Sequence, residues 1–215
     1  MVRRRPWAVA AAVALIVFAM GACVTPVRVG ILQRLGWALV AEDPLTRADA
    51  IVLTVDVGRA GVLEAADLVH QGIATRVVVF FESPESAVEE YRRRGIPVEE
   101  PVDVITRDLQ AAGVSEVAKM PTPVTGTEEQ GPVLAQWCAD QRLTAIVVVS
   151  LPDHSRRVRR VLRRAMQNSS TRVIVRPARY GLFDPNRWWR SRGGIRTQVE
   201  ELQKLTVDIL RHPLS

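Results

Sequence analysis

The chain has 215 residues, of which 47% are hydrophobic and 24% are charged. This length and composition fit one domain with a short additional segment and exclude a disordered or low-complexity chain. The formal net charge of +6 conceals two segments of opposite sign: residues 41–140 carry 18 acidic and 8 basic residues, and residues 156–196 carry 13 arginines and one acid. We expect either that the two segments neutralise each other across the folded surface or that the basic one attracts an anionic partner.

The first segment of the chain, residues 1–24, predicts a membrane anchor. Three arginines at positions 3–5 precede residues 7–24, a stretch of 18 residues without a charged side chain, which is just long enough for a membrane-spanning helix. The arginines favour the cytoplasmic side, so the rest of the chain is expected on the extracytoplasmic side of the plasma membrane. Two alternatives remain open: a cleaved signal peptide, and a lipoprotein attached through Cys23, because the sequence MGAC is similar to a lipobox.

The cysteines and histidines give no pattern of metal ligands. Cys23 lies in the predicted anchor, so a disulfide within the domain is not expected, and Cys138 is expected to be a small core residue. His70, His154 and His212 have no Cys or His neighbour at ligand spacing. We therefore expect no metal and no other cofactor.

The order of the predicted elements indicates an α/β domain over residues 48–215, after a juxtamembrane connection over residues 25–47. In the connection, apolar residues recur at helical spacing and predict a helix: Leu32, Leu35, Leu39 and Val40. Short β-branched runs then predict strands over 48–55, 76–81, 116–120, 145–150 and 172–177. Helical patterns alternate with them over 61–72, 83–95, 102–113, 127–141 and 197–210. This alternation predicts a mainly parallel sheet covered by helices on both faces.

In such a fold the ligand crevice lies beyond the carboxyl ends of the strands. Asp56 and Gly58 follow the first predicted strand, and the glycine would let backbone N–H groups approach a phosphate. A tight turn with a solvated Asp56 is the structural alternative. After the second strand, residues 82–85 are explained by ordinary helix capping.

The helix predicted at 127 begins with Thr127, Glu128 and Glu129. A hydroxyl and two carboxylates at a helix N-terminus are typical capping residues. The same groups, facing a crevice, would suit a sugar or a hydrated phosphate. Thr127 and Glu128 are therefore candidate ligand-binding residues, and Glu129 is a candidate catalytic carboxylate.

The sequence VVVSLPDHSRRVRRVLRRA, residues 147–165, contains the strongest candidates. The strand ends at Ser150, and the apolar positions of the following helix form one stripe, which leaves its six arginines on an expected solvated face. Asp153 and His154 lie at the strand-to-helix corner, where a histidine can exchange protons near neutral pH. Arg157, three residues later, can bind a phosphate through two N–H groups. A structural role is the alternative for both His154 and Arg157.

Residues 176–194, RPARYGLFDPNRWWRSRGG, combine arginines with aromatic residues. This pattern is compatible with base stacking, but an extracytoplasmic domain makes nucleic acid an unexpected partner. Arginine and tryptophan together also suit the interfacial layer of an anionic membrane. A loop held by tryptophan packing is the third interpretation.

Several of these segments together resemble the YdcF/SanA/ElyC-like family of bacterial envelope proteins. The resemblance covers roughly residues 48–206 and rests on ADAIVLTVDVG, EAADLVHQGIATRVVVFFES, TGTEEQ, IVVVSLPDHSRRVRRVLRRA and WW…EELQKL. Its most specific points are His154-x-x-Arg157 and Glu201-x-x-Lys204. The chain departs from the family in its glycine turns, because the turn Thr54–Gly58 retains one glycine and Glu82-Ser83 stands where Ser-Gly-Gly is usual.

The resemblance implies a Rossmann-like three-layer fold and a role in envelope integrity or peptidoglycan assembly, while the family's reaction is poorly defined. We therefore expect a membrane-anchored protein that binds a phosphorylated, lipid-linked cell-wall precursor. His154 would exchange a proton, Arg157 would hold the phosphate, and Thr127 with Glu129 would position the polar group opposite. Asp56, Gly58 and Ser150, at the predicted strand ends, are further candidate substrate-binding residues. One alternative is a non-catalytic scaffold or a module that binds anionic lipid through its arginine face. A second alternative is a cytoplasmic nucleotide-binding enzyme, which requires the predicted topology to be wrong.

Overall fold

The central structural feature is a five-stranded, fully parallel sheet. A computed structural model of the chain describes residues 25–213. The strands are β1 (Ala50–Leu53), β2 (Arg76–Val79), β3 (Glu116–Lys119), β4 (Ala145–Ser150) and β5 (Arg172–Pro177). Their order in the sheet is β3-β2-β1-β4-β5, which matches the first five positions of the Rossmann strand order. The predicted parallel sheet is confirmed.

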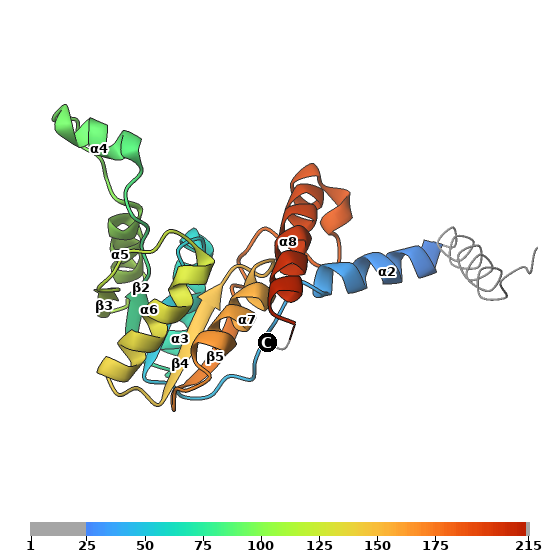
Figure 1. The fold of residues 1–215 in the computed structure, drawn as a ribbon, viewed down its shortest axis with the longest axis horizontal. Helices are drawn as coiled ribbons and strands as arrows, with labels where there is room; N and C mark the ends of the chain where they lie inside the picture. The colour runs from blue at the N-terminus through green and yellow to red at the C-terminus, as the bar shows by residue number, and fades with distance from the viewer. Residues whose placement is uncertain (1–24, 214–215) are drawn as a thin grey trace, which may run out of the picture.

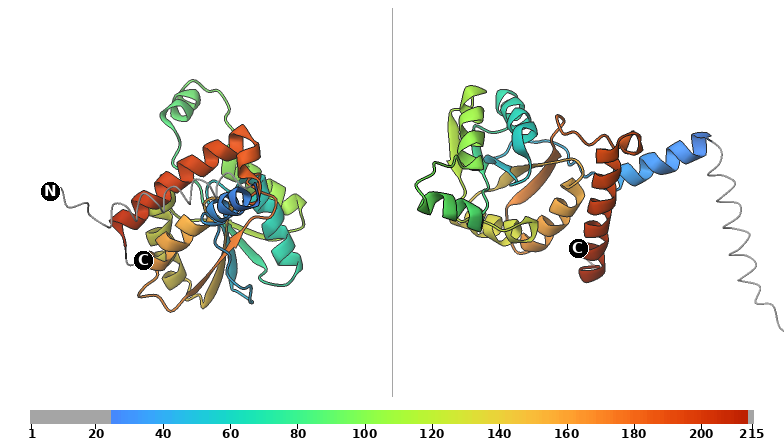
Figure 2. Two further views of the ribbon diagram at one scale, coloured as in Figure 1. Left: turned by 90° about the vertical axis from the view of Figure 1, so that its right-hand side faces the viewer. Right: turned by 90° about the horizontal axis from the view of Figure 1, so that it is seen from above.

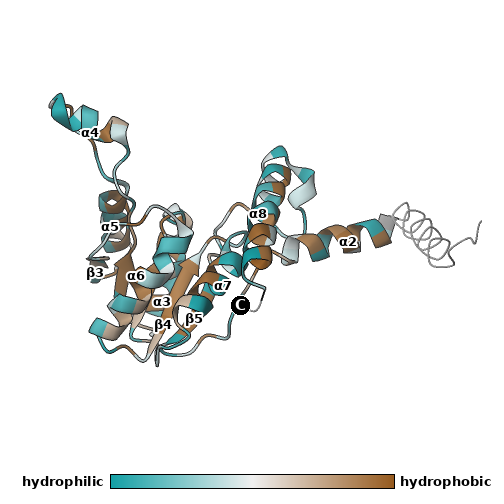
Figure 3. Cartoon of the chain, in the orientation of Figure 1, coloured by the Kyte–Doolittle hydropathy of each residue, from teal (hydrophilic) through white to brown (hydrophobic). Residues whose placement is uncertain are grey.

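Helices cover the sheet on both faces, as the alternation of elements predicts (Figures 1 and 2). Helices α3 (Gly58–His70) and α5 (Pro101–Ala111) pack on one face, and α6 (Thr127–Asp140) and α7 (Ser155–Ala165) pack on the other. Each strand sends alternate residues to the two faces, so that in β4 Val147 and Val149 join the first core cluster and Ile146 and Val148 join the second. Apolar residues line the strands and the inner sides of these helices (Figure 3).

Within residues 25–213, three further α-helices and one short 3-10 helix lie outside these layers. Helix α8 (Arg192–Arg211) packs beside α7, and α2 (Thr25–Trp37) extends away from the body near the start of α8 (Figure 1). Helix α4 (Ser86–Arg93) projects at the opposite end of the molecule and contains no buried residue. A short 3-10 helix, η1 (Trp188–Arg190), precedes α8.

The sequence predicts two of these segments only in part. The last helix begins at Arg192, five residues before the predicted start, because the Ser191 hydroxyl accepts a hydrogen bond from the N–H of Gly194 and caps the new first turn. Helix α2 ends at Trp37, so Leu39 and Val40 are not part of the predicted helical stripe. They are buried instead in a small third cluster with Phe183 and Leu205.

The membrane anchor predicted for residues 1–24 lies outside the described residues. Within residues 25–213, no helix combines the length and apolar composition that crossing a bilayer requires.

The arginines of α7 do not form the solvated face that the sequence predicts. Arg160 donates to Asp208 of α8 at 2.5 Å, and Arg164 contacts the other oxygen of Asp208 at 2.7 Å. Arg159 pairs with Asp43, and Arg156 donates to the backbone carbonyl of Val40. Acidic residues of α8 face α7, so most of the positive charge of α7 is neutralised by ion pairs and hydrogen bonds within the fold.

The pairing of Asp208 predicts an unequal effect of two substitutions on α8. Asp208 is almost fully buried, so Asp208→Ala leaves two arginines without their partner and should lower the free energy of unfolding by about 3 kcal/mol. Glu200→Ala is the matched control, because Glu200 pairs with Arg196 in an exposed position and its loss should cost less than about 1 kcal/mol. Urea unfolding followed by circular dichroism measures both, and equal effects would contradict a charged α7–α8 interface.

Candidate functional site

A cavity of about 660 Å³ opens at the carboxyl edge of the sheet. Strands β1 and β4 are neighbours, and the chain leaves them in opposite directions, to β2 and to β5, which makes this the topological switch point of the sheet. We call it the switch-point cavity. It is lined by residues that follow β1, β4 and β5 and by the first turns of α8: Asp56, Val57, Ala60, Leu151, Asp153, Tyr180, Gly181, Leu182, Phe183, Ser191, Gly193, Gly194 and Thr197.

His154 stands beside this cavity, in the turn that joins β4 to α7. Its Nδ1 lies 2.7 Å from Oε2 of Glu201, and its Nε2 lies 3.2 Å from Oδ2 of Asp56 and 3.5 Å from Oδ2 of Asp153. The side chain is 14% exposed. The imidazole therefore joins a buried carboxylate on α8 to two carboxylates that line the cavity.

Glu201 is the most enclosed member of the group, with a side chain that is 3% exposed. Besides His154, its Oε2 accepts hydrogen bonds from Nε and Nη2 of Arg157, at 3.3 and 3.2 Å. Its Oε1 accepts a hydrogen bond from Nζ of Lys204 at 2.6 Å. Both oxygens are thus satisfied, as a buried carboxylate requires.

The electrostatics of this group favour a charged imidazole. Burial by itself would lower the pKa of His154, but the hydrogen bond to Glu201 and the charges of Asp56 and Asp153 outweigh it and raise this pKa. Burial would raise the pKa of Glu201, yet its hydrogen bonds with His154 and Lys204, together with the charge of Arg157, hold it at about 2. Burial raises the pKa of Asp153, against the opposing effect of His154.

Two side-chain hydroxyls, of Thr54 and Ser155, fix Asp56 and the corner that carries His154. The Thr54 hydroxyl, directly after β1, donates to Oδ1 of Asp56 at 2.9 Å and leaves Oδ2 directed toward His154. Ser155 is buried at the start of α7, where its hydroxyl donates to the carbonyl of Pro152 and accepts from the N–H of Ala41. These bonds fix the corner on which His154 stands.

The loop after β5, which forms another wall of the cavity, is held by a fully buried carboxylate on α3. Glu64 accepts hydrogen bonds from Nε of Arg176 at 2.8 Å and from the N–H and Nε of Arg179 at 3.0 and 2.9 Å. The next residue, Tyr180, donates its hydroxyl to Asp67 at 2.7 Å. These pairs join the acidic and basic segments of the chain, which is the neutralisation that the sequence allows.

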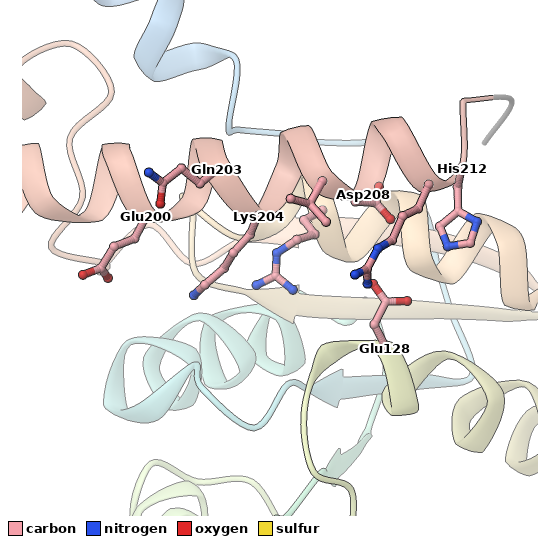
Figure 4. A pocket seen from close by; sticks show the side chains of 9 residues that line it. Glu128, Glu200, Gln203, Lys204, Asp208 and His212 are labelled. Atoms are coloured by element: carbon pink, nitrogen blue, oxygen red, sulfur yellow. The ribbon is translucent and has the colours of Figure 1, made fainter.

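A second cavity, of about 480 Å³, lies between α6, α7 and α8 (Figure 4). Its lining mixes both charges: Glu128, Arg157, Glu200, Gln203, Lys204, Val207, Asp208, Arg211 and His212. Arg157 lines this cavity and contacts His154, whereas Asp56 and Asp153 line the switch-point cavity. The chain of contacts from Asp56 through His154 to Arg157 therefore connects the two cavities.

The structure brings together three of the predicted site residues, His154, Arg157 and Asp56. Arg157 does not stand free for a phosphate, because its guanidinium donates to Glu201 and lines the second cavity. Its geometry is that of a positioning residue for Glu201.

The other predicted site residues lie outside this cluster. Glu129 turns back to accept a hydrogen bond from the N–H of Thr125 at 2.7 Å, which lowers its pKa and makes it a cap. Glu128 pairs with Arg164 at 3.1 Å. Thr127 borders a small apolar void under α7, and Ser150 is buried with its hydroxyl donated to the carbonyl of Leu151.

Gly58 begins α3 one residue after Val57, which lines the cavity. Its φ of +51° lies in the left-handed region that other residues rarely adopt, so the turn requires glycine for its backbone shape. This position is explained without a ligand.

Three members of the cluster receive no site role in the sequence analysis: Glu201 and Lys204 enter it only through the resemblance, and Asp153 only by its place beside His154. The signal for Glu201 is its place in Glu201-x-x-Lys204, together with Asp208 seven residues later. Acids at this spacing share one face of a helix, and that face lies against the arginines of α7. Asp153 is adjacent to His154 and is distinguished by its burial.

No group of three or more His, Cys, Asp or Glu side chains within residues 25–213 is arranged to hold a metal ion. Cys138 is buried, as expected for a core residue, and burial raises the pKa of its thiol to about 12.

No protein-family model matches the chain, and no curated protein matches it. Among solved structures, it is similar to the reductase domain of an aureusimine biosynthetic cluster, with 11% identity and a TM-score of 0.30. The match covers 67% of this chain and 54% of that domain, so the chain spans about half the length of the protein it matches. A similarity this low carries no argument about function.

The raised pKa of His154 predicts a pH dependence of stability. The contacts of the charged imidazole stabilise the fold fully below its unfolded-state pKa of about 6.5, and this contribution is lost as the pH rises through the folded-state pKa. The difference in unfolding free energy between the wild type and His154→Gln should therefore be larger at pH 6 than at pH 9, as measured by urea unfolding. A difference that grows with pH would contradict the charged His154–Glu201 pair.

Proposed function

We propose that this chain is a membrane-anchored envelope protein of the YdcF/SanA/ElyC-like type, whose switch-point cavity binds a phosphorylated glycan precursor. The observation that carries the proposal is the contact of His154 with Glu201 on one side and with the cavity-lining Asp56 on the other. The two most specific points of the resemblance, His154-x-x-Arg157 and Glu201-x-x-Lys204, are 44 or more residues apart in the chain and meet in this one cluster. This meeting supports the family assignment.

The chemistry of the cavity fits a polyhydroxylated ligand. Its volume lies within the range of small-molecule sites. Asp56 and Asp153 offer carboxylate oxygens that accept hydrogen bonds from sugar hydroxyls, and Tyr180 and Phe183 offer apolar surface for a sugar ring.

The placement of the phosphate follows from the same lining. Two carboxylates repel a phosphate at their end of the cavity. The first turn of α8, with Ser191, Gly193 and Gly194, lines the cavity too, and the N–H groups of a helix's first turn attract anions. We therefore place the phosphate at α8 rather than at Arg157.

In this arrangement His154 is a proton donor. Glu201 fixes its Nδ1 and raises its pKa, so the imidazole keeps a proton near neutral pH. A ligand hydrogen-bonded to Asp56 would be one contact away from the Nε2 proton. Proton donation to a departing oxygen is the step that the group is suited to assist.

The alternative of a scaffold that binds anionic lipid through the arginine face of α7 gains no support from the geometry. Arg157, Arg160 and Arg164 are all paired with acids and are no more than 17% exposed. A lipid-facing surface would have to lie elsewhere on the molecule.

The proposal predicts that the cavity carboxylates matter for binding. With N-acetylglucosamine 1-phosphate as the probe and ligand-observed NMR as the measurement, Asp56→Asn in the full-length chain should weaken binding about tenfold, the loss of roughly 1.4 kcal/mol. Glu129→Gln is the control and should bind as the wild type does, because its carboxylate only caps its own loop. Absence of binding to the wild type, or equal binding by both variants, would refute the proposed ligand class.

A second test addresses the proton donor in the cell. His154→Ala should fail to complement a strain with an envelope defect that the wild-type chain corrects, while Glu129→Ala should complement fully. Full complementation by a folded and membrane-localised His154→Ala protein would remove His154 from the mechanism.

A further inference from the structure

We propose that a surface formed by α2, η1 and the first turns of α8 lies against an anionic lipid bilayer. This inference goes beyond the proposed ligand, although the first turn of α8 also lines the switch-point cavity through Ser191, Gly193 and Gly194. We call it the α2–η1 surface, and we define it by five exposed arginines: Arg28, Arg34, Arg187, Arg190 and Arg192.

These arginines belong to one structural unit, although they come from opposite ends of the chain. The indole N–H of Trp188 donates to the carbonyl of Leu32 at 2.8 Å, and the indole N–H of Trp37 donates to Asn186 at 3.0 Å. Gln198 of α8 donates to the carbonyl of Leu35 at 2.9 Å. Gly36 packs so closely on the loop before η1 that a Cβ there would lie 2.2 Å from the carbonyl oxygen of Pro185. Helix α2 is therefore fixed to η1 and α8 at its C-terminal end (Figure 2).

The charge of this surface is not neutralised within the described part of the chain. None of the five arginines forms an ion pair with a residue of 25–213, in contrast to Arg157, Arg160 and Arg164 of α7. Asp184 is the single acid in the segment from 184 to 199, and it accepts a hydrogen bond from the N–H of Asn186.

The position of Arg190 and Arg192 is unfavourable for the helix that they precede or begin. The first turn of α8 contains no acidic residue, and positive charge at a helix N-terminus opposes the helix dipole. Arg157, in the first turn of α7, is compensated by Glu201 of α8, whereas Arg190 and Arg192 form no ion pair within residues 25–213. An external negative charge would supply the missing compensation.

Exposed apolar side chains accompany the arginines and favour a bilayer as the occupant. Trp37 is 47% exposed, and Ile195 and Val199, one turn apart on α8, are 45% and 49% exposed. Arginine mixed with tryptophan and aliphatic residues is the composition of interfacial segments, which place charges at headgroups and apolar atoms at the acyl boundary. An acidic protein would use the arginines but would leave these apolar groups unexplained.

The neighbouring sequence leads to the same occupant. Helix α2 begins at Thr25, immediately after the uncharged apolar residues 7–24. A surface rigidly joined to α2 is therefore joined to the segment of the chain that is richest in apolar residues. The surface and that segment would engage one bilayer together.

Hydrogen–deuterium exchange of the full-length chain on vesicles tests the proposal. With vesicles of phosphatidylcholine containing 30% phosphatidylglycerol, peptides covering residues 28–37 and 187–199 should exchange at least threefold more slowly than with pure phosphatidylcholine. The protection should disappear at 0.5 M salt, which screens headgroup attraction. Equal exchange on the two kinds of vesicle, or protection that persists at high salt, would overturn the proposal.

Two double variants assign the effect to these arginines. Arg190→Gln with Arg192→Gln should abolish the protection, and removal of positive charge from the start of α8 should not weaken that helix. Arg142→Gln with Arg163→Gln removes two exposed arginines elsewhere and should retain it. Retained protection in the first variant would overturn the proposal. Polyglutamate without lipid is a further control: if it protects the wild type as well as the anionic vesicles do, the partner is an acidic protein and the proposal is wrong. Asp56→Asn keeps all five arginines and should retain the vesicle protection while it weakens binding of the sugar-phosphate probe, so the two proposals fail separately.

Discussion

A buried carboxylate, Glu201, is the constraint on which the candidate site depends. A charged group of this kind is tolerated in a protein interior only when hydrogen-bond donors surround it. Three donors meet at Glu201: the imidazole of His154, the guanidinium of Arg157 and the ammonium of Lys204. Their convergence attaches α8 to α7, sets the orientation of the imidazole and thereby places its other nitrogen beside Asp56 at the cavity.

The α7–α8 interface as a whole follows the same principle. Its inner contacts are ion pairs. Glu201 pairs with Arg157, and Asp208 pairs in the same way with Arg160 and Arg164. Such an interface fixes one register between two helices, because a shift along the axis would leave buried charges unpaired. It also leaves apolar residues of α8 such as Val199 on the outside, where they are available to a bilayer.

The sequence predicts the fold well where burial alone decides the structure. The run at 145–150 becomes β4 with the predicted bounds, because a strand buried on both faces must be almost continuously apolar. The run at 172–177 also keeps its predicted bounds as β5, an edge strand in which Ile174 and Val175 are buried. The bounds are less accurate where a single hydrogen bond decides them, as at the Ser191 cap of α8. Strand order does not follow from the pattern, since the sequence of a strand does not say which other strand it will pair with.

The candidate site is predicted in part, for an equally physical reason. His154 directly follows a predicted strand, and ligand sites of parallel sheets lie at the carboxyl ends of the strands. Its place in the sequence is therefore enough to predict that it lies near the cavity. Its partner Glu201 is 47 positions later, and the periodicity of α8 does not reveal which helix its acidic face will meet. The sequence predicts solvated arginines on α7 because charged side chains of a single helix are normally exposed. It does not reveal that the acidic face of α8 covers them.

The most direct test of this account is a double-mutant cycle between His154 and Glu201. Unfolding free energies at pH 6 for the wild type, His154→Gln, Glu201→Gln and the double variant give the coupling free energy of the pair. The account predicts a favourable coupling of about 1.5–3 kcal/mol, the range of a hydrogen bond between charged groups. Additive effects within about 0.5 kcal/mol would contradict it, because Glu201 would then not hold the imidazole.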